Sequence, residues 1–190
     1  MSWIISLIAA TLVFGGQSSF EPTVTIAAPV EAVRAADSTQ TGDETEKIDK
    51  TYPLNSDGRV SIENINGSIT IDTWDRNEVR LEAEKIAGTR ERLNEIEVEV
   101  NSTPSYLKIE TEFNRRERNW NCDKDCRMEV RYKLTVPRGA ALNEIETVNG
   151  SVMISNTTNM VRASAVNGNV TAMNLAGAAQ IDTVNGRTEV

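Results

Sequence analysis

Hydrophobic and polar positions alternate through most of the chain after residue 52, and Asn-Gly pairs interrupt the alternation. Apolar residues at every second position predict β-strands with one buried face, and Asn-Gly is a strong turn signal. Near the C-terminal end the pairs begin at Asn149, Asn167 and Asn185, a spacing of 18 residues twice over. A fixed period is typical of stacked supersecondary units. The pattern therefore predicts an all-β fold, a β-solenoid with rungs of about 18 residues and two strands each.

Each repeat unit has room for two short strands and two turns. Two strands cannot bury a core alone, so we expect each strand to pair with its copy in the next unit around a continuous apolar column. The residues that we expect to point into this column are Val148, Val152, Val166, Val170 and Val184.

The Asn-Gly turns are predicted to stack at one corner as a structural ladder. The ladder residues are Asn66, Gly67, Asn149, Gly150, Asn167, Gly168, Asn185 and Gly186. Turn chemistry explains both residue types, because they tolerate positive φ, and the asparagines can bond to one another along the stack. A binding edge formed by the asparagines is the alternative. A calcium-binding β-roll is disfavoured, because no unit contains Gly-Gly-x-Gly-x-Asp.

An earlier copy of the repeat lies upstream of an insert. The phrase Ile62–Ile69 matches Ile145–Val152, so Asn66 marks a fourth turn of the same kind. The separation of 83 residues between Asn66 and Asn149 is no multiple of 18, which indicates an insertion.

The insert, residues 85–138, holds three longer alternating stretches with charged residues and threonine at most intervening positions. These stretches are 96–100, 107–113 and 128–136. We expect antiparallel hairpins with one solvated face that cap the first rung. A single helical turn is expected over Gly88–Leu93.

The N-terminal part of the chain has a different character. The apolar run Trp3–Phe14 would span about 18 Å as a helix, short of a hydrocarbon core of roughly 30 Å, and its length fits a secretory signal. We expect a signal peptide over 1–18 and a disordered linker over 19–51, which is rich in Ala, Thr, Pro, Ser and acidic residues. No Lys or Arg precedes the run, so an uncleaved membrane anchor stays open, as does a buried helix or strand.

Composition limits the possible chemistry. The net charge of −8 makes the chain a poor partner for nucleic acid or anionic lipid. The absence of histidine excludes Ser-His-Asp and Cys-His nucleophilic systems and His-ligated metals. We expect no catalytic residues, no cofactor and no metal site.

The two cysteines, Cys122 and Cys126, lie in a charged segment between the second and third stretches of the insert. In an exported chain such a pair is most simply a disulfide that pins a loop. Free thiols, or metal or redox use with Asp123 and Asp125, are the alternatives, although further metal ligands are not visible.

The segment Gly58–Ile69, the turn Thr73–Val79 and the repeated Val-Asn-Gly together resemble bacterial β-strand-repeat proteins, a domain family of unknown function called "putative adhesins". The resemblance covers residues 52–190 and implies an exported β-solenoid in the periplasm or at the cell surface. It offers no catalytic residues. Proteins of this family have further rungs and a closing segment, so we expect that the chain, which stops within a strand at Val190, is a fragment. The alternative is that a partner or a second copy covers that edge by edge-to-edge association.

Three functions follow as hypotheses. The first is a non-enzymatic cell-envelope protein that presents a surface for adhesion or scaffolding to an envelope or cell-surface component. The second is a carbohydrate-active enzyme with Glu63, Asp72 and Asp75 as paired carboxylates near Trp74. The third is an accessory of envelope-stress signalling that contacts the membrane through an uncleaved N-terminal segment.

Overall fold

The computed structural model describes residues 42–114 and 126–190, and the compact β unit spans Gln40–Val190. The predicted signal peptide, most of the predicted linker and Cys122 lie outside the described residues. Among the helices of the described ranges, none has the length and apolarity needed to cross a membrane.

The described residues form an all-β structure with a single short helix. The elements in chain order are β1 Glu44–Pro53, β2 Arg59–Asn66, β3 Ile69–Trp74, β4 Glu78–Ala87, α1 Arg90–Asn94, β5 Ile96–Thr103, β6 Tyr106–Phe113, β7 Met128–Pro137, β8 Ala141–Asn149, β9 Val152–Ser155, β10 Val161–Asn167, β11 Val170–Met173, β12 Ala179–Asn185 and β13 Thr188–Glu189.

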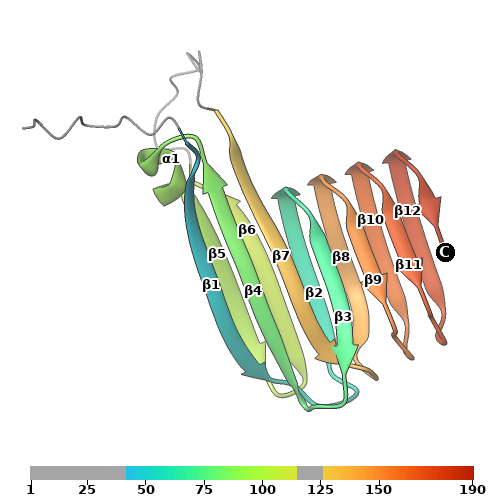
Figure 1. Ribbon diagram of the computed structural model, residues 1–190. Helices are drawn as coiled ribbons and strands as arrows, with labels where there is room; N and C mark the ends of the chain where they lie inside the picture. Colours follow the sequence, from blue (N-terminus) through green and yellow to red (C-terminus); the bar gives the residue numbers. More distant parts are fainter. Residues whose placement is uncertain (1–41, 115–125) are drawn as a thin grey trace, which may run out of the picture. The chain divides into compact units, whose positions relative to one another are not determined.

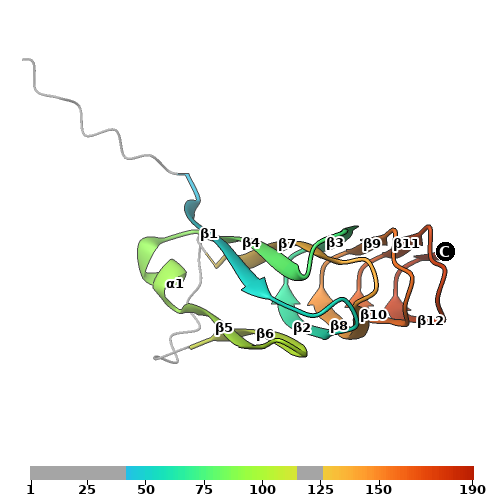
Figure 2. The same cartoon turned by 90° about the horizontal axis from the view of Figure 1, so that it is seen from below.

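Two mixed sheets lie face to face as two layers (Figures 1 and 2). Sheet I has seven strands in the order β1-β4-β7-β3-β9-β11-β13, and sheet II has six in the order β12-β10-β8-β2-β6-β5. The chain passes from sheet II to sheet I at each Asn-Gly pair, for example from β8 to β9. The strands on either side of an Asn-Gly pair therefore do not pair with each other, unlike those of a hairpin.

The predicted pairing between copies of the repeat is confirmed. In sheet II, Glu146 of β8 pairs with Ser164 of β10, and Ser164 pairs with Asp182 of β12, in parallel and 18 residues apart each time. The earlier copy joins the same stack, because Asn66 of β2 pairs with Asn149 of β8 across the whole insert.

The expectation that the insert consists only of antiparallel hairpins is wrong. β5 and β6 do form an antiparallel hairpin, but β6 pairs in parallel with β2, and β7 pairs in parallel with β3. β6 and β7 thus extend the two sheets beside the earlier copy, while β4 and β5 flank them in antiparallel orientation. Apolar alternation is the same in parallel and antiparallel strands, so the sequence did not distinguish them.

The core lies between the two sheets and is built from the inward side chains of both. Val152 and Val170 are buried in it, as predicted. The predictions for Val148, Val166 and Val184 are wrong, because these side chains are 39%, 40% and 74% exposed. The strict alternation of a strand does not continue through a corner. Just before these corners, the side chains that point inward are therefore those of Thr147 and Ala165, each 2% exposed, and not those of the valines that follow them.

The predicted linker ends earlier than residue 51, because β1 is a strand from Glu44 onward. Ile48 is the only apolar residue of β1 before Tyr52, so the composition of this segment indicated disorder. The antiparallel ladder with β4 supplies its backbone partners. Arg80 also binds Asp49 across this ladder at 2.7 Å.

The predicted helical turn is confirmed as α1. Thr89 begins it, since its side chain accepts a hydrogen bond from the backbone N–H of Arg92. Capping of this kind satisfies a backbone donor that the first turn leaves free. Leu93 is fully buried, so α1 packs against the core near the ends of β4 and β5 (Figure 2).

Candidate functional site

The Asn-Gly corner carries a ladder of side-chain amides. The Nδ2 of Asn149 donates to Oδ1 of Asn66 at 2.8 Å, and Asn167 and Asn185 repeat this bond to the preceding asparagine at 2.9 Å each. One donor and one acceptor of the inner amides are therefore used within the stack, which leaves each amide less capacity to bind a ligand.

Close packing explains most of the corner glycines better than backbone conformation does. Among the described glycines, only Gly67 has a positive φ, at 120°. A Cβ on Gly150 would lie 2.0 Å from the carbonyl oxygen of Gly67, and a Cβ on Gly168 would lie 1.8 Å from that of Gly150. Successive corners stack backbone against backbone, with no room for a side chain between them.

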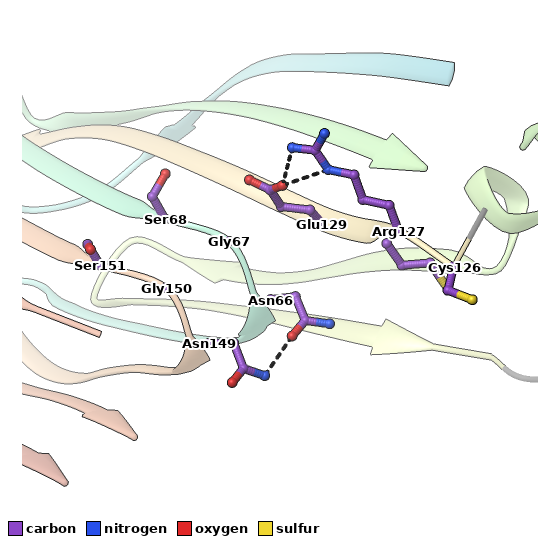
Figure 3. A pocket seen from close by; sticks show the side chains of 10 residues that line it. Asn66, Gly67, Ser68, Cys126, Arg127, Glu129, Asn149, Gly150 and Ser151 are labelled. Atoms are coloured by element: carbon purple, nitrogen blue, oxygen red, sulfur yellow. Dashed lines mark hydrogen bonds and ion pairs between the residues drawn. The ribbon is translucent and has the colours of Figure 1, made fainter. Parts of the chain in front are cut away.

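A recess of about 480 Å³ opens beside this corner (Figure 3). Its lining includes Asn66, Asn149 and the start of β7, where Arg127 donates to the Glu129 carboxylate at 2.8 Å. Cys126 also lines it, but its predicted partner Cys122 lies outside the described residues, so the disulfide stays a prediction. Two pairs of the polar side chains drawn in Figure 3 are bonded to each other, Arg127 with Glu129 and Asn149 with Asn66.

The turns that follow β9 and β11 are held by a different ladder. Asn156 and Asn174 have left-handed backbones, with φ of 62° and 56°, and Asn174 donates to Asn156 at 3.0 Å. Asn156 in turn donates to the Asp72 carboxylate at 2.9 Å. This hydrogen bond, followed by one from the Thr73 backbone, lowers the pKa of Asp72. The Asp72 carboxylate thus accepts the last hydrogen bond of the ladder that runs from Asn174 through Asn156.

The structure separates Glu63 from Asp72, two of the carboxylates proposed for glycoside hydrolysis. Glu63 points outward from sheet II and Asp72 from sheet I, so the core separates them. Asp75 pairs with Arg138 at 3.1 Å. The indole N–H of Trp74 donates to the carbonyl oxygen of Glu78 at 2.7 Å, which fixes the ring in its own turn.

The outer face of sheet II carries two rows of side chains that sequence reasoning missed. The apolar row consists of Ile65, Val148, Val166 and Val184. Three of these side chains have nearly equal exposure, 40% for Ile65, 39% for Val148 and 40% for Val166. The alternation within the strand could have predicted this row. Val148 is two residues from the charged Glu146, so both side chains lie on the outer face, opposite to Ile145.

The carboxylate row runs beside the apolar row, two residues earlier on each central strand. Across the sheet its successive register partners are Glu99, Glu110, Glu63 and Glu146, followed by Ser164, which has no charge, and Asp182. Neighbouring strands lie about 4.8 Å apart, so these carboxylates are close enough to repel one another. Lys108 relieves part of this repulsion, since its ammonium group binds both Glu110 and Glu63. These two carboxylates raise the pKa of Lys108.

A groove of about 310 Å³ lies where the two rows meet. The charged residues that line it are Glu63, Glu110, Glu112 and Glu146, the apolar ones are Ile65, Val148 and Val166, and none of the lining residues is aromatic. We take this groove as the candidate functional site, because it combines exposed apolar area with uncompensated charge.

The sequence matches no protein-family model, and no curated protein resembles it at a significant level. Several solved structures are similar in fold. One is described as a "putative cell adhesion protein" from Clostridium sporogenes, with 9% identity over 77% of this chain and 98% of that chain, and a TM-score of 0.40.

Two others come from Parabacteroides distasonis. A "putative adhesin" has 14% identity over 76% of this chain and a TM-score of 0.37, and this chain covers 57% of its length. A "putative lipid binding protein" has 16% identity over 78% of this chain and a TM-score of 0.36, and this chain covers 61% of its length. Structures with TM-scores of 0.36 to 0.40 carry no argument about function, so the function of this chain is inferred from its own described residues.

Proposed function

We propose that the protein is an exported, non-enzymatic β-solenoid of the bacterial cell envelope that presents its outer sheet faces for adhesion or scaffolding. The observation that carries the proposal is the groove on sheet II, where the apolar row stays exposed in strand after strand. Contiguous apolar area on a soluble surface is typical of an interaction site.

The geometry supports a rigid surface more than a reaction centre. Parallel register and two ladders of asparagine amides hold each rung to the next. Such an array presents side chains at fixed intervals, which favours binding along an extended partner. The N-terminal apolar run, Trp3–Phe14, has the length of a secretory signal and supports the proposed export, which would bring the protein to the envelope component.

The test combines binding with a check for turnover. Purified full-length chain is incubated with cell-wall, glycan and membrane-protein fractions, and both its retention and the release of new products are measured. We expect retention without product. The matched control is Asp75→Asn, which removes a carboxylate proposed for hydrolysis and leaves the groove intact. Retention by none of the fractions, or product release that Asp75→Asn abolishes, would overturn the proposal.

The compartment is tested separately. Sequencing the N-terminus of the protein recovered from cells distinguishes a trimmed, exported chain from an anchored one. We expect a new N-terminus near residue 19. A product that keeps Met1 and sediments with membranes would favour the anchored accessory of envelope-stress signalling instead.

A further inference from the structure

The outer faces of the two sheets differ in how their charges are compensated. On sheet I, Arg80 binds Asp49 at 2.7 Å and approaches Glu82 at 3.5 Å, and Lys133 binds Glu82 at 3.3 Å. Lys47 similarly pairs with Glu84 at 3.4 Å. Cations and carboxylates therefore alternate on that face.

On sheet II the balance is different. Lys108 is shared between Glu63 and Glu110, whereas Arg162 lines a recess together with Glu146 and Asp182 but forms no ion pair with either. In the described part of the chain, neither Glu112 nor Glu146 takes part in an ion pair, although both line the groove. Like charges on adjacent strands destabilise a sheet, so the folded chain retains an arrangement that costs it stability.

From this charge complementarity and the adjacent apolar row, we propose that the groove of sheet II binds a polypeptide segment of a partner protein that carries both basic and apolar side chains. The two rows are separated by two residues along each strand, which corresponds to about 6.6–6.8 Å. A segment lying across the strands would place Lys or Arg side chains on the carboxylate row and its apolar side chains on Ile65, Val148 and Val166.

Other ligands fit the groove less well. The described residues contain no group of acidic or cysteine side chains arranged to hold a metal ion. Anionic lipid headgroups would be repelled by the carboxylates. The groove lining also lacks an aromatic ring on which a sugar could stack. A cationic polypeptide satisfies the carboxylates and covers the apolar row at the same time.

The probe is a labelled peptide with Lys-Leu-Lys-Thr repeated three times and both ends blocked, titrated with full-length protein and followed by fluorescence anisotropy. A peptide with Glu in place of Lys is the control ligand. We expect saturable binding of the Lys peptide only, and weaker binding as salt rises from 50 to 200 mM, since salt screens exposed charges.

Variants locate the binding on the protein. Glu63→Gln with Glu146→Gln is expected to weaken binding about fivefold, from the loss of two exposed charge contacts. Val148→Thr with Val166→Thr is expected to weaken it by a similar factor of about five, because apolar area is lost. Each pair changes solvent-facing positions, and circular dichroism checks that the fold is kept.

Matched controls sit on the opposite sheet. Glu82→Gln with Glu84→Gln changes the net charge by the same amount, and Met153→Thr with Met173→Thr replaces side chains of comparable exposure, 45% and 47%. We expect either pair to change the affinity for the Lys peptide less than about twofold, because these exposed side chains do not contact the peptide.

The inference is overturned if the Lys peptide binds no more tightly than the Glu peptide, or if the sheet I variants weaken binding as much as the sheet II variants. Saturable calcium binding that is lost in the Glu63→Gln and Glu146→Gln variant would also overturn it in favour of a cation site. The inference rests on the proposed scaffolding role, but the two fail separately. If an envelope fraction still retains the protein while the peptide does not bind, only the partner chemistry is wrong.

Discussion

Two buried threonine hydroxyls differ in their partners. The Thr111 hydroxyl lies 2.7 Å from the Tyr132 hydroxyl inside the core, whereas the Thr157 hydroxyl is buried with no hydrogen-bond partner. A buried polar group that loses its partner costs about 1–3 kcal/mol, while an unpaired one can be replaced by a methyl group at little cost. The two positions therefore make a matched pair.

We predict that Thr111→Val lowers the free energy of unfolding by about 1–3 kcal/mol, because it leaves the Tyr132 hydroxyl unpaired. Thr157→Val should leave the free energy of unfolding unchanged or raise it. Urea denaturation of both variants beside the parent chain measures the difference. Equal destabilisation by the two substitutions would contradict the assignment of their partners.

The Tyr132 phenol gives a prediction in alkali. Burial raises its pKa to about 12, against an ordinary value of 10.0, although the hydrogen bond with Thr111 acts in the opposite direction. The folded state thus holds this proton more tightly than the unfolded state. Its contribution to stability is complete below pH 10 and is lost as the pH rises toward 12, in total about 3 kcal/mol for two pH units.

Tyr132→Phe should remove this part of the alkaline loss of stability. The measurement is the free energy of unfolding at intervals from pH 9 to 12 for both chains. Thr111→Val keeps the phenol and removes a hydrogen bond that lowers its pKa, so the alkaline loss should persist or increase, and this variant serves as the control. An unchanged slope in Tyr132→Phe would show that other groups cause the loss.

At the scale of elements, successive repeat units are held together by backbone contact at the Asn-Gly corners. The glycines matter because each corner rests directly on the next, and the asparagine side chains then bond along the stack. The sequence indicated the right residues for a partly different reason. It pointed to turns whose residues tolerate positive φ, whereas among the described glycines only Gly67 has a positive φ.

We predict that Gly150→Ala destabilises the protein by about 1–3 kcal/mol, the usual range for overpacking, because its Cβ would meet the Gly67 carbonyl oxygen at 2.0 Å. Gly42→Ala is the control, since a Cβ there would have nothing within 4 Å. Thermal denaturation compares the two variants with the parent. Similar melting temperatures for all three chains would show that the corners can move apart without cost.

At the scale of the whole β unit, burial falls along the stack. Ile145 of β8 is fully buried, whereas Ile181, the residue of β12 in the same register, is only partly buried, and the outward Val184 of β12 is 74% exposed. β8 is bonded to a strand on each side, and β12 lies at the end of the sheet order. In a stacked structure each rung is stabilised mainly by its neighbours, so opening should begin where contacts are fewest.

We predict that backbone amides of β12 exchange with solvent at least about tenfold faster than those of β8 under native conditions. Amides of β10 should be intermediate. Hydrogen exchange followed by mass spectrometry of peptides from each strand measures the order. Equal protection in β8 and β12 would indicate that the β unit opens only as a whole.

The sequence by itself determined the features that depend on neighbouring residues. Alternation located most of the strands, Asn-Gly located the corners, and the spacing of 18 residues from Asn149 to Asn167 predicted which strands would pair. These signals are local or strictly repeated, so they are readable without knowledge of the contacts.

Only the tertiary structure decided what depends on distant partners. β1 is a strand because β4 lies beside it, and β6 enters the stack in parallel because β2 offers an edge there. The groove is assembled in the same way, since Glu110, Glu63 and Glu146 come from strands that are separated by long stretches of chain. Their proximity is set by the register between strands, and register across an insert is not encoded in the spacing of residues along the chain.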